Sequence, residues 1–482
     1  MKAWPGRGIW GTSALLLLLA AAIVFELHPA GRAATSAAQR QRVGGAEIGD
    51  GRLPKILAAL GALRSRAPES GSDQPRRIPA AAEPVDWETA GARRDGSGVG
   101  SEAGEGPRRL SITVSPAALE GLLEQPRQKL EASAEMVLRQ GERVLYAGFV
   151  GLRLHGGRSR RFGPVRSWRL VFRPTQGAAG LALSLLHWPG DEPLTRLIVH
   201  GDQRTDAAGD LWRMTNPIAL EVAQRLGAAV PQTAPARLEI NGRDHGLVFL
   251  TEPIDLAYLR RHRGHDRFVL VRSKRDRRES RWRAGTVLHW RLAQKWWRRQ
   301  PDRSYDEIRA RYDLASLEAW FLASLTCGTT DAYQGALVRD ESAPLGRWSW
   351  IAWDMDQSFM AARQPMTEPW QEDVWAHLLR RPRDDFRNPI LRTLIRNSPQ
   401  YRQRLAERLR WALDERLDEA FRDALLGRYR EIAEHYQVAD DESLDRIEEF
   451  LERRPAVLRA RVAERLPRGD LGGALPPSPT PR

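Results

Sequence analysis

The segment RWSWIAWDMDQSF, residues 347–359, brings three tryptophans directly up against two aspartates. Trp348 and Trp350 alternate with other residues, as in a strand that packs one face against a core. Asp354 and Asp356 follow two residues apart, so on an extended segment their side chains point to the same side. The segment therefore predicts a rigid, packed strand that carries a pair of carboxylates at its end.

A third aspartate belongs to the same part of the chain. A helix is predicted to begin after Asp313, its N-cap, and to end at Gly328. A loop containing Asp331 follows, and the strand GALVRD then turns back through ESAPLGR into the tryptophan-rich strand. Because the two outer ends of a hairpin lie together, we expect Asp331 to lie near Asp354 and Asp356.

Carboxylates gathered at one strand end repel one another unless a cation compensates them. Oxygen ligands without His or Cys favour Mg²⁺ or Mn²⁺, with phosphate oxygens completing the coordination shell. This arrangement suits phosphoryl transfer, in which the protein positions its substrates and neutralises charge. Two alternatives stand beside this prediction: the aspartates cap a turn, or DMD is the D-x-D motif of a sugar-nucleotide transferase.

The chain of 482 residues divides into a strand-rich half and a helical half. Short strands are predicted from RRLSITVS to RFVLVRS, with Asn241-Gly242 marking one hairpin turn and NPIALEVAQRLG forming a single helix among them. From Pro389 onwards the charged, periodic sequence predicts helices. An α+β fold is therefore expected for residues 108–467, with a β-rich N-terminal lobe and a helical C-terminal lobe that share a cleft.

The ends of the chain predict segments outside this domain. Residues 1–27 hold an uncharged apolar run, Ile9 to Phe25, which predicts a membrane anchor, with a cleaved secretory signal as the alternative. Residues 28–107 and 468–482 are rich in small and polar residues and predict a disordered linker and a disordered tail. The protein is therefore expected at the cell membrane or envelope, or outside the cell if the signal is cleaved.

Composition excludes several classes of site. The net charge of +14 comes from arginines spread along the whole chain, and no nucleic-acid-binding motif occurs, so no nucleic-acid partner is expected. A single cysteine, Cys327, excludes an internal disulfide and a cysteine-based zinc site. The stretch HWRLAQKWWRRQPDR predicts a helix that packs its tryptophans into the core or lies on a membrane or an acidic partner.

Four stretches of the chain, taken in order, resemble the CotH family of atypical protein kinases, the spore-coat-protein-H type. They are GLRLHGGRSRRFGPVRSWRLVF (151–172), TNPIALEVAQRLG (215–227), LEINGRDHGLVFLTEPID (238–255) and WSWIAWDMDQSF (348–359). The resemblance implies a kinase that binds ATP with Mg²⁺ or Mn²⁺ between two lobes. It also implies transfer of the γ-phosphate to a hydroxyl acceptor, first of all a Ser or Thr of a protein.

The resemblance assigns roles to four residues around the predicted hairpin. Asp331 falls on the catalytic-loop aspartate, which accepts or orients the acceptor hydroxyl. Asp354 falls on the metal-binding aspartate, with Asp356 as a second ligand or as its orienter. Gln334 lies where the family has an Asn metal ligand, a departure that is expected to weaken metal binding.

The same resemblance points to residues that would contact the cofactor. Arg166 and Arg169 flank the start of the strand in which the family's phosphate-contacting lysine is expected, and Glu221 is the expected partner of that cation. Glu252 stands where the segment that joins the lobes would begin. An arginine in place of the lysine keeps the charge but changes the geometry. These departures leave open a second function, that of a pseudokinase or cell-envelope scaffold without transfer activity.

Overall fold

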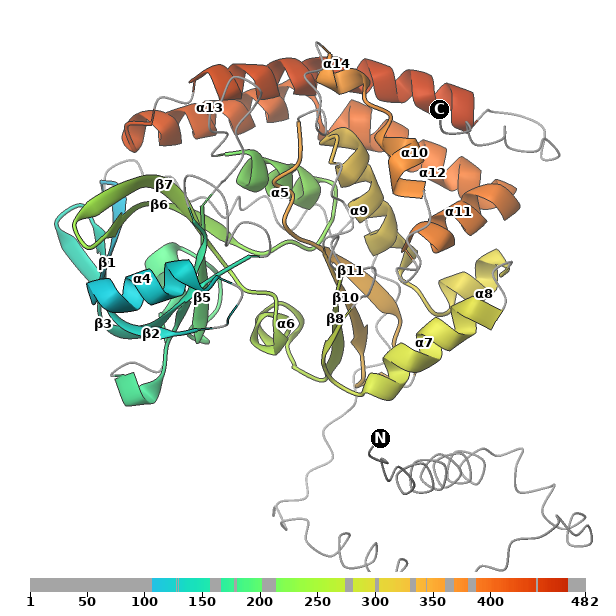
Figure 1. Cartoon of the computed structure of the whole chain (residues 1–482). Helices are drawn as coiled ribbons and strands as arrows, with labels where there is room; N and C mark the ends of the chain where they lie inside the picture. Colours follow the sequence, from blue (N-terminus) through green and yellow to red (C-terminus); the bar gives the residue numbers. More distant parts are fainter. Residues whose placement is uncertain are drawn as a thin grey trace, which may run out of the picture. The chain divides into compact units, whose positions relative to one another are not determined.

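Seven strands close into a barrel in the computed structural model (Figure 1). Their spatial order is β1-β2-β3-β4-β5-β7-β6, and β1 closes the barrel by pairing in parallel with β6, with Arg109 opposite Arg237. Every other pair of barrel strands is antiparallel. The strands are β1 (Arg108–Val114), β2 (Ala132–Gln140), β3 (Arg143–Leu154), β4 (Trp168–Val171), β5 (Arg196–His200), β6 (Thr233–Ile240) and β7 (Arg243–Thr251).

The structure describes residues 106–126, 128, 130–156, 166–176, 180–201, 214–273, 281–299, 303–329, 335–343, 345–359, 368–379, 387–438 and 441–466. All of them lie in one unit of the chain, residues 82–482. The predicted anchor, nearly all of the predicted linker and the predicted tail lie outside the described residues. None of the helices described is long and apolar enough to cross a membrane.

Local signals in the sequence place the turns of the barrel correctly. Asn241 and Gly242 have φ angles of 52° and 76°, the left-handed pair that a two-residue type I′ turn requires between β6 and β7. The helix predicted after Ser115 is α4 (Pro116–Glu124), and the Ser115 hydroxyl accepts a hydrogen bond from the backbone N–H of Ala118 at 3.3 Å. The inside of the barrel is filled by side chains such as Leu110 and Met136, both fully buried.

A second sheet has the order β11-β10-β8-β9. Its strands are β8 (Phe268–Ser273), β9 (Arg281–Ala284), β10 (Gly335–Asp340) and β11 (Trp348–Ala352). Gly335 lies opposite Ala352, so the predicted hairpin is confirmed, and the start of β10 and the end of β11 share one edge of the sheet. The strand β8 pairs with β10 rather than with the barrel, although it stands in the strand-rich half of the sequence.

The tryptophans of β11 form the packed base that the sequence predicts. Trp348 and Trp350 are only 4% and 1% exposed. The ring of Trp350 lies 6.0 Å from that of Tyr312, and the backbone N–H of Trp350 donates to the Ser316 hydroxyl at 3.1 Å. The helix that carries Ser316 therefore covers the outer edge of this strand.

Helices form most of the rest of the described chain (Figure 1). They are α5 (Thr215–Arg225), α6 (Leu256–Arg263), α7 (Val287–Arg299), α8 (Tyr305–Arg309), α9 (Leu314–Thr326), α10 (Val374–Leu379), α11 (Arg387–Asn397), α12 (Pro399–Trp411), α13 (Glu419–His435) and α14 (Asp441–Arg465), with a π-helical turn at Ala412–Arg416. The expectation of a single helix among the strands is wrong. The helix α6 also lies there, with Asp255 as its N-cap and Gly264, at φ 82°, after its end.

The basic, tryptophan-rich helix α7 packs its tryptophans inward. Trp290 and Trp297 are 4% and 8% exposed, and both belong to the large core that the helices share with α5 and β11. The burial of these two tryptophans therefore confirms the prediction that this stretch is a helix packed into the core through its tryptophans.

Hydrogen bonds from the end of α13 attach the helices to the barrel. The Tyr436 hydroxyl accepts from the backbone N–H of Arg108 at 3.0 Å and donates to the carbonyl of Pro235 at 3.1 Å. Arg237 donates to the Tyr436 carbonyl at 3.1 Å. Burial raises the pKa of Tyr436 to about 12, so the hydroxyl keeps its proton and its donor role throughout the neutral range.

Replacing Tyr436 with Phe tests this attachment. The substitution removes the buried hydroxyl that binds both the N–H of Arg108 and the carbonyl of Pro235, so we expect the free energy of unfolding to fall by about 1–3 kcal/mol. Urea denaturation of the purified protein measures the change. Tyr305→Phe, at a partly buried tyrosine packed against the same core, is the matched control and is expected to stay within about 0.5 kcal/mol of the wild type. Equal losses in the two variants would contradict the assignment.

Candidate functional site

The segment after β11 is held at both ends by backbone hydrogen bonds. Asp354 adopts the left-handed conformation, with φ 57°, and turns the chain out of the strand. The N–H of Met355 then donates to the side-chain oxygen of Asn216, in α5, at 2.8 Å. The N–H of Phe359 donates to the carbonyl of Cys327, at the end of α9, at 2.7 Å. The two predicted metal ligands therefore lie in a turn whose backbone is fixed by two different helices.

A buried pair of hydroxyls adds a third tie at the same place. Ser358 and Thr329 lie 2.6 Å apart, oxygen to oxygen, and are 0% and 1% exposed. Thr329 is the last described residue before the loop that contains Asp331 and Gln334, and that loop lies outside the described residues. The proximity of Asp331 to Asp354 therefore stays a prediction, although Thr329, which precedes Asp331, contacts Ser358, which follows Asp354.

Residues at the ends of barrel strands meet the end of β11. His200, the last residue of β5, places its Nε2 3.7 Å from Oδ1 of Asp354. His155 follows β3, and its ring stands edge-on to Trp353, with 6.4 Å between the ring centroids. Arg169, in β4, lies 3.0 Å from His155, from Nη2 to Nδ1. Three neighbouring barrel strands thus bring His155, Arg169 and His200 to the carboxylate end of the second sheet.

Asp354 and Asp356 offer carboxylate oxygens to a divalent cation, but they form no complete ligand set among the described residues. The Asp354 side chain is 24% exposed, and Asp356 is partly exposed although its Oδ1 atom is buried. Carboxylate oxygens are the ligands that Mg²⁺ and Mn²⁺ prefer. Within the described part of the chain, no group of three or more His, Cys, Asp or Glu residues could hold a metal. A complete ligand set therefore needs atoms from elsewhere, such as the undescribed Gln334 or the phosphates of a nucleotide.

The arginines predicted to contact phosphate lie at the start of β4. Arg169 reaches the site through His155, as described above. Arg166 stands two residues before β4 and is partly exposed. The structure therefore brings Arg169 near the predicted metal-binding end of β11, whereas a phosphate contact for either arginine stays a prediction.

Glu221 has other partners than the arginines of β4. Its carboxylate accepts a hydrogen bond from Arg428 and another from the hydroxyl of Tyr429, the latter at 2.8 Å. Burial raises the pKa of Glu221 above its usual range, while the charge of Arg428 acts against this shift. The expected pairing of Glu221 with Arg166 or Arg169 is therefore not what the structure shows; Glu221 joins α5 to α13 instead.

Glu252 begins the segment between the barrel and the second sheet. Its carboxylate is 1% exposed, and Arg261 donates to Oε1 at 2.9 Å. His262 lies 2.9 Å from Oε2, and the backbone N–H of Gln232 donates to the same oxygen at 3.4 Å. Both oxygens thus hold α6 against the end of β7. The predicted place of Glu252 at a joint between two lobes and its contact with the cofactor both stay predictions.

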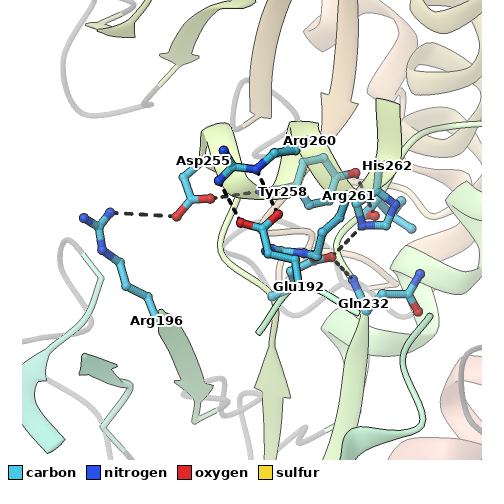
Figure 2. Close-up of polar contacts among 10 residues, drawn as sticks. Glu192, Arg196, Gln232, Asp255, Tyr258, Arg260, Arg261 and His262 are labelled. Atoms are coloured by element: carbon cyan, nitrogen blue, oxygen red, sulfur yellow. Dashed lines mark hydrogen bonds and ion pairs between the residues drawn. The ribbon is translucent and has the colours of Figure 1, made fainter. Parts of the chain in front are cut away.

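A second ion pair supports α6 from its exposed side. Arg260 donates to both carboxylate oxygens of Glu192, at 2.9 and 2.7 Å, and lies 2.9 Å from Asp266. Figure 2 shows this pair near Arg261 and His262. Asp255 also faces Arg196, with 3.8 Å between the charged atoms. The connecting helix is therefore fixed by a buried carboxylate on one side and by exposed charges on the other.

His155 and His200 were not singled out by the sequence. Each is a lone histidine with no ligand spacing to other histidines, and only the closure of the barrel brings both to Asp354 and Trp353. The signal that could have found them is their position at the ends of predicted strands, where side chains of neighbouring strands converge.

Comparison with known proteins identifies the family. The family model described as CotH kinase protein matches residues 152–466, well over half of the chain. The chain belongs to the CotH kinase family. The match contains the strand that carries Arg169, the helix that carries Glu221 and the turn that carries Asp354 and Asp356. The predicted family membership is therefore confirmed.

Solved structures also include a similar protein. The Helicobacter pylori proinflammatory kinase CtkA aligns with 56% of this CotH family chain and 91% of its own, with 13% sequence identity and a TM-score of 0.28. No curated protein matches the sequence.

Replacing Glu252 with Gln tests the role of the buried carboxylate. The substitution leaves the buried guanidinium of Arg261 without its counter-charge, so we expect the free energy of unfolding to fall by about 3 kcal/mol. Glu192→Gln removes the charge from the exposed pair with Arg260 and is expected to cost less than about 1 kcal/mol. Urea denaturation of both variants measures the difference, and a loss in Glu192→Gln as large as that in Glu252→Gln would contradict the assignment.

Proposed function

We propose that this protein transfers the γ-phosphate of ATP to a hydroxyl acceptor, a Ser or Thr of a protein substrate. Membership of the CotH kinase family supports phosphoryl transfer as the reaction class. The turn after β11 is the observation that links this proposal to particular residues. There, Asp354 lies 3.7 Å from His200, and Ser358 contacts Thr329, the last described residue before the loop of Asp331.

The nucleotide binds between a barrel lobe and a helical lobe in this proposal. Two contacts between the barrel and the end of β11 support that location, His200 with Asp354 and His155 with Trp353. The connection through Glu252 and α6 then serves as the joint between the lobes.

Asp354 and Asp356, together with Gln334, would hold Mg²⁺ or Mn²⁺, which when bound neutralises charge on the β- and γ-phosphates. Asp331 accepts or orients the proton of the acceptor hydroxyl, and needs to lie within hydrogen-bond reach of that oxygen. Arg169 supplies positive charge toward the phosphates from β4, with Arg166 beside it. Each of these groups positions a substrate or offsets a developing charge.

A pseudokinase is the second candidate function. The arginine at the position of the family's phosphate-contacting lysine and the glutamine at position 334 favour it. Such a protein binds ATP at the same turn but transfers nothing.

Substitutions of the predicted metal ligand Asp354 and of the predicted catalytic residue Asp331 distinguish a kinase from a pseudokinase. We expect Asp354→Asn to lower the transfer of labelled phosphate from ATP, in the presence of Mn²⁺, at least about 100-fold, because charge neutralisation supplies much of the catalysis in this reaction. Asp331→Asn is expected to lower kcat about 100-fold or more while Mn²⁺-dependent ATP binding is retained. Asp414→Asn, at an exposed aspartate paired with Arg459, is the charge-matched control and is expected to keep wild-type activity.

The wild type decides between the functions in the same assay. ATP binding that depends on Asp354 without any transfer identifies a pseudokinase. Absence of both transfer and Mn²⁺-dependent ATP binding rejects the kinase proposal, and turnover of a sugar nucleotide would favour a glycosyl-transfer reaction instead.

Residues 1–27 anchor the protein in the membrane in this proposal. We expect the full-length protein to stay in carbonate-washed membranes and a chain lacking residues 1–27 to be released, because a single apolar span resists the wash whereas a surface contact does not. Release of the full-length chain with a mature N-terminus after residue 27 would identify a cleaved signal instead.

A further inference from the structure

One side chain of the long C-terminal helix α14 touches both segments of the proposed catalytic site. The ring of Phe450 stands edge-on to Phe359, with 5.5 Å between the ring centroids. The same ring lies against Gly328, where a Cβ would approach Phe450 Cζ to 2.7 Å. Gly328 has φ 63°, so both its conformation and the space beside it require glycine. Gly328 follows the end of α9, and α14 packs against that helix.

A buried arginine one turn further along α14 holds the end of α9. Arg454 is 1% exposed, and its Nε donates to the carbonyl of Leu325 at 3.0 Å. Its Nη1 donates to the carbonyls of Trp370 and Glu372, at 2.5 and 2.9 Å. Carbonyls at a helix C-terminus lack partners within the helix and favour a cation, which Arg454 provides. Loss of water around the guanidinium lowers the pKa of Arg454 to about 10.

The two segments are also bonded to each other, as shown above. The N–H of Phe359 donates to Cys327, and the hydroxyls of Thr329 and Ser358 are in contact. One of these segments leads to Asp331 and the other contains Asp354 and Asp356. A displacement of α14 therefore moves both together, because neither can shift without breaking a bond to the other.

We infer that Phe450 and Arg454 are positioning residues that hold the end of α9, at 325–329, against the turn at 354–359, which contains Asp354 and Asp356. The inference rests on the proposed kinase function. Neither residue belongs to the proposed binding machinery, and both act through the segments that they hold. Rigid support of this kind matters because misplacement of catalytic groups by about 1 Å can lower a rate about 100-fold.

Phe450→Leu is the first test, with Phe421→Leu as the matched control. Phe421, in α13, packs against the same core and lies under the guanidinium of Arg225, 5.0 Å from Cζ to the ring centroid. We expect Phe450→Leu to speed hydrogen–deuterium exchange about 10-fold in peptides from both 325–329 and 354–359, since the contact at their junction is loosened. The seven barrel strands and the Phe421→Leu variant are expected to exchange as the wild type does in these regions.

Steady-state kinetics distinguish a positioning role from a purely structural one. We expect Phe450→Leu to lower kcat about 10-fold with KM for ATP within about 2-fold, because spacing rather than ground-state binding is disturbed. Arg454→Met is expected to behave in the same way, and Arg454→Lys to recover part of kcat, since it restores a cation near the carbonyl of Leu325.

Two kinds of hydrogen–deuterium exchange result would contradict this role of Phe450. Faster exchange in only one of the two segments would show that Phe450 does not couple them. Equal acceleration in the barrel strands, or the same pattern in Phe421→Leu, would show a general loss of stability. If the wild type transfers no phosphate, the proposed function fails, whereas exchange still decides whether Phe450 holds both segments.

Discussion

The candidate site depends on two hydrogen bonds that backbone N–H groups of the turn after β11 donate to neighbouring helices. A non-glycine residue in the left-handed conformation costs of order 1–2 kcal/mol, so Asp354 needs surroundings that hold it there. Asn216, in α5, binds Met355 on one side of the turn, and Cys327, at the end of α9, binds Phe359 on the other. The carboxylates therefore have defined positions only after α5 and α9 have packed.

The packing of α5 explains why the strand-rich and helical halves cannot be separate domains. The helix lies between barrel strands in the sequence, yet its apolar residues belong to the core formed with α9 and the C-terminal helices. Glu221 and Arg225 extend from α5 to α13 and to the π-helical turn, where Arg225 and Arg416 each donate to the other's carbonyl, at 3.0 and 3.2 Å. One helix from the first half is thus a structural part of the second, and it also supplies Asn216 to the site.

The parts of the fold that the sequence predicts are those determined by neighbours in the chain. The β10–β11 hairpin, the Asn241-Gly242 turn and the cap at Ser115 each depend on a few adjacent residues. Closure of the barrel through β1 and β6 and the pairing of β8 with β10 join strands that are distant in sequence, and no local pattern specifies such partners. The same limit applies to the site. The Asp354–Asp356 pair is visible in the sequence, whereas its neighbour His200 and the true partners of Glu221 follow from tertiary structure alone.

Some arginines of this basic chain bind backbone carbonyls where parts of the fold meet. Arg237 donates to a carbonyl between the barrel and α13, and Arg454 donates to three carbonyls around the end of α9. A guanidinium can satisfy several carbonyls at once because its donors spread in a plane, which a lysine ammonium does not reproduce. These arginines are therefore committed to backbone groups within the fold. The proposed contact with phosphate therefore falls to other arginines, Arg166 and Arg169, and Arg169 lies 3.0 Å from His155.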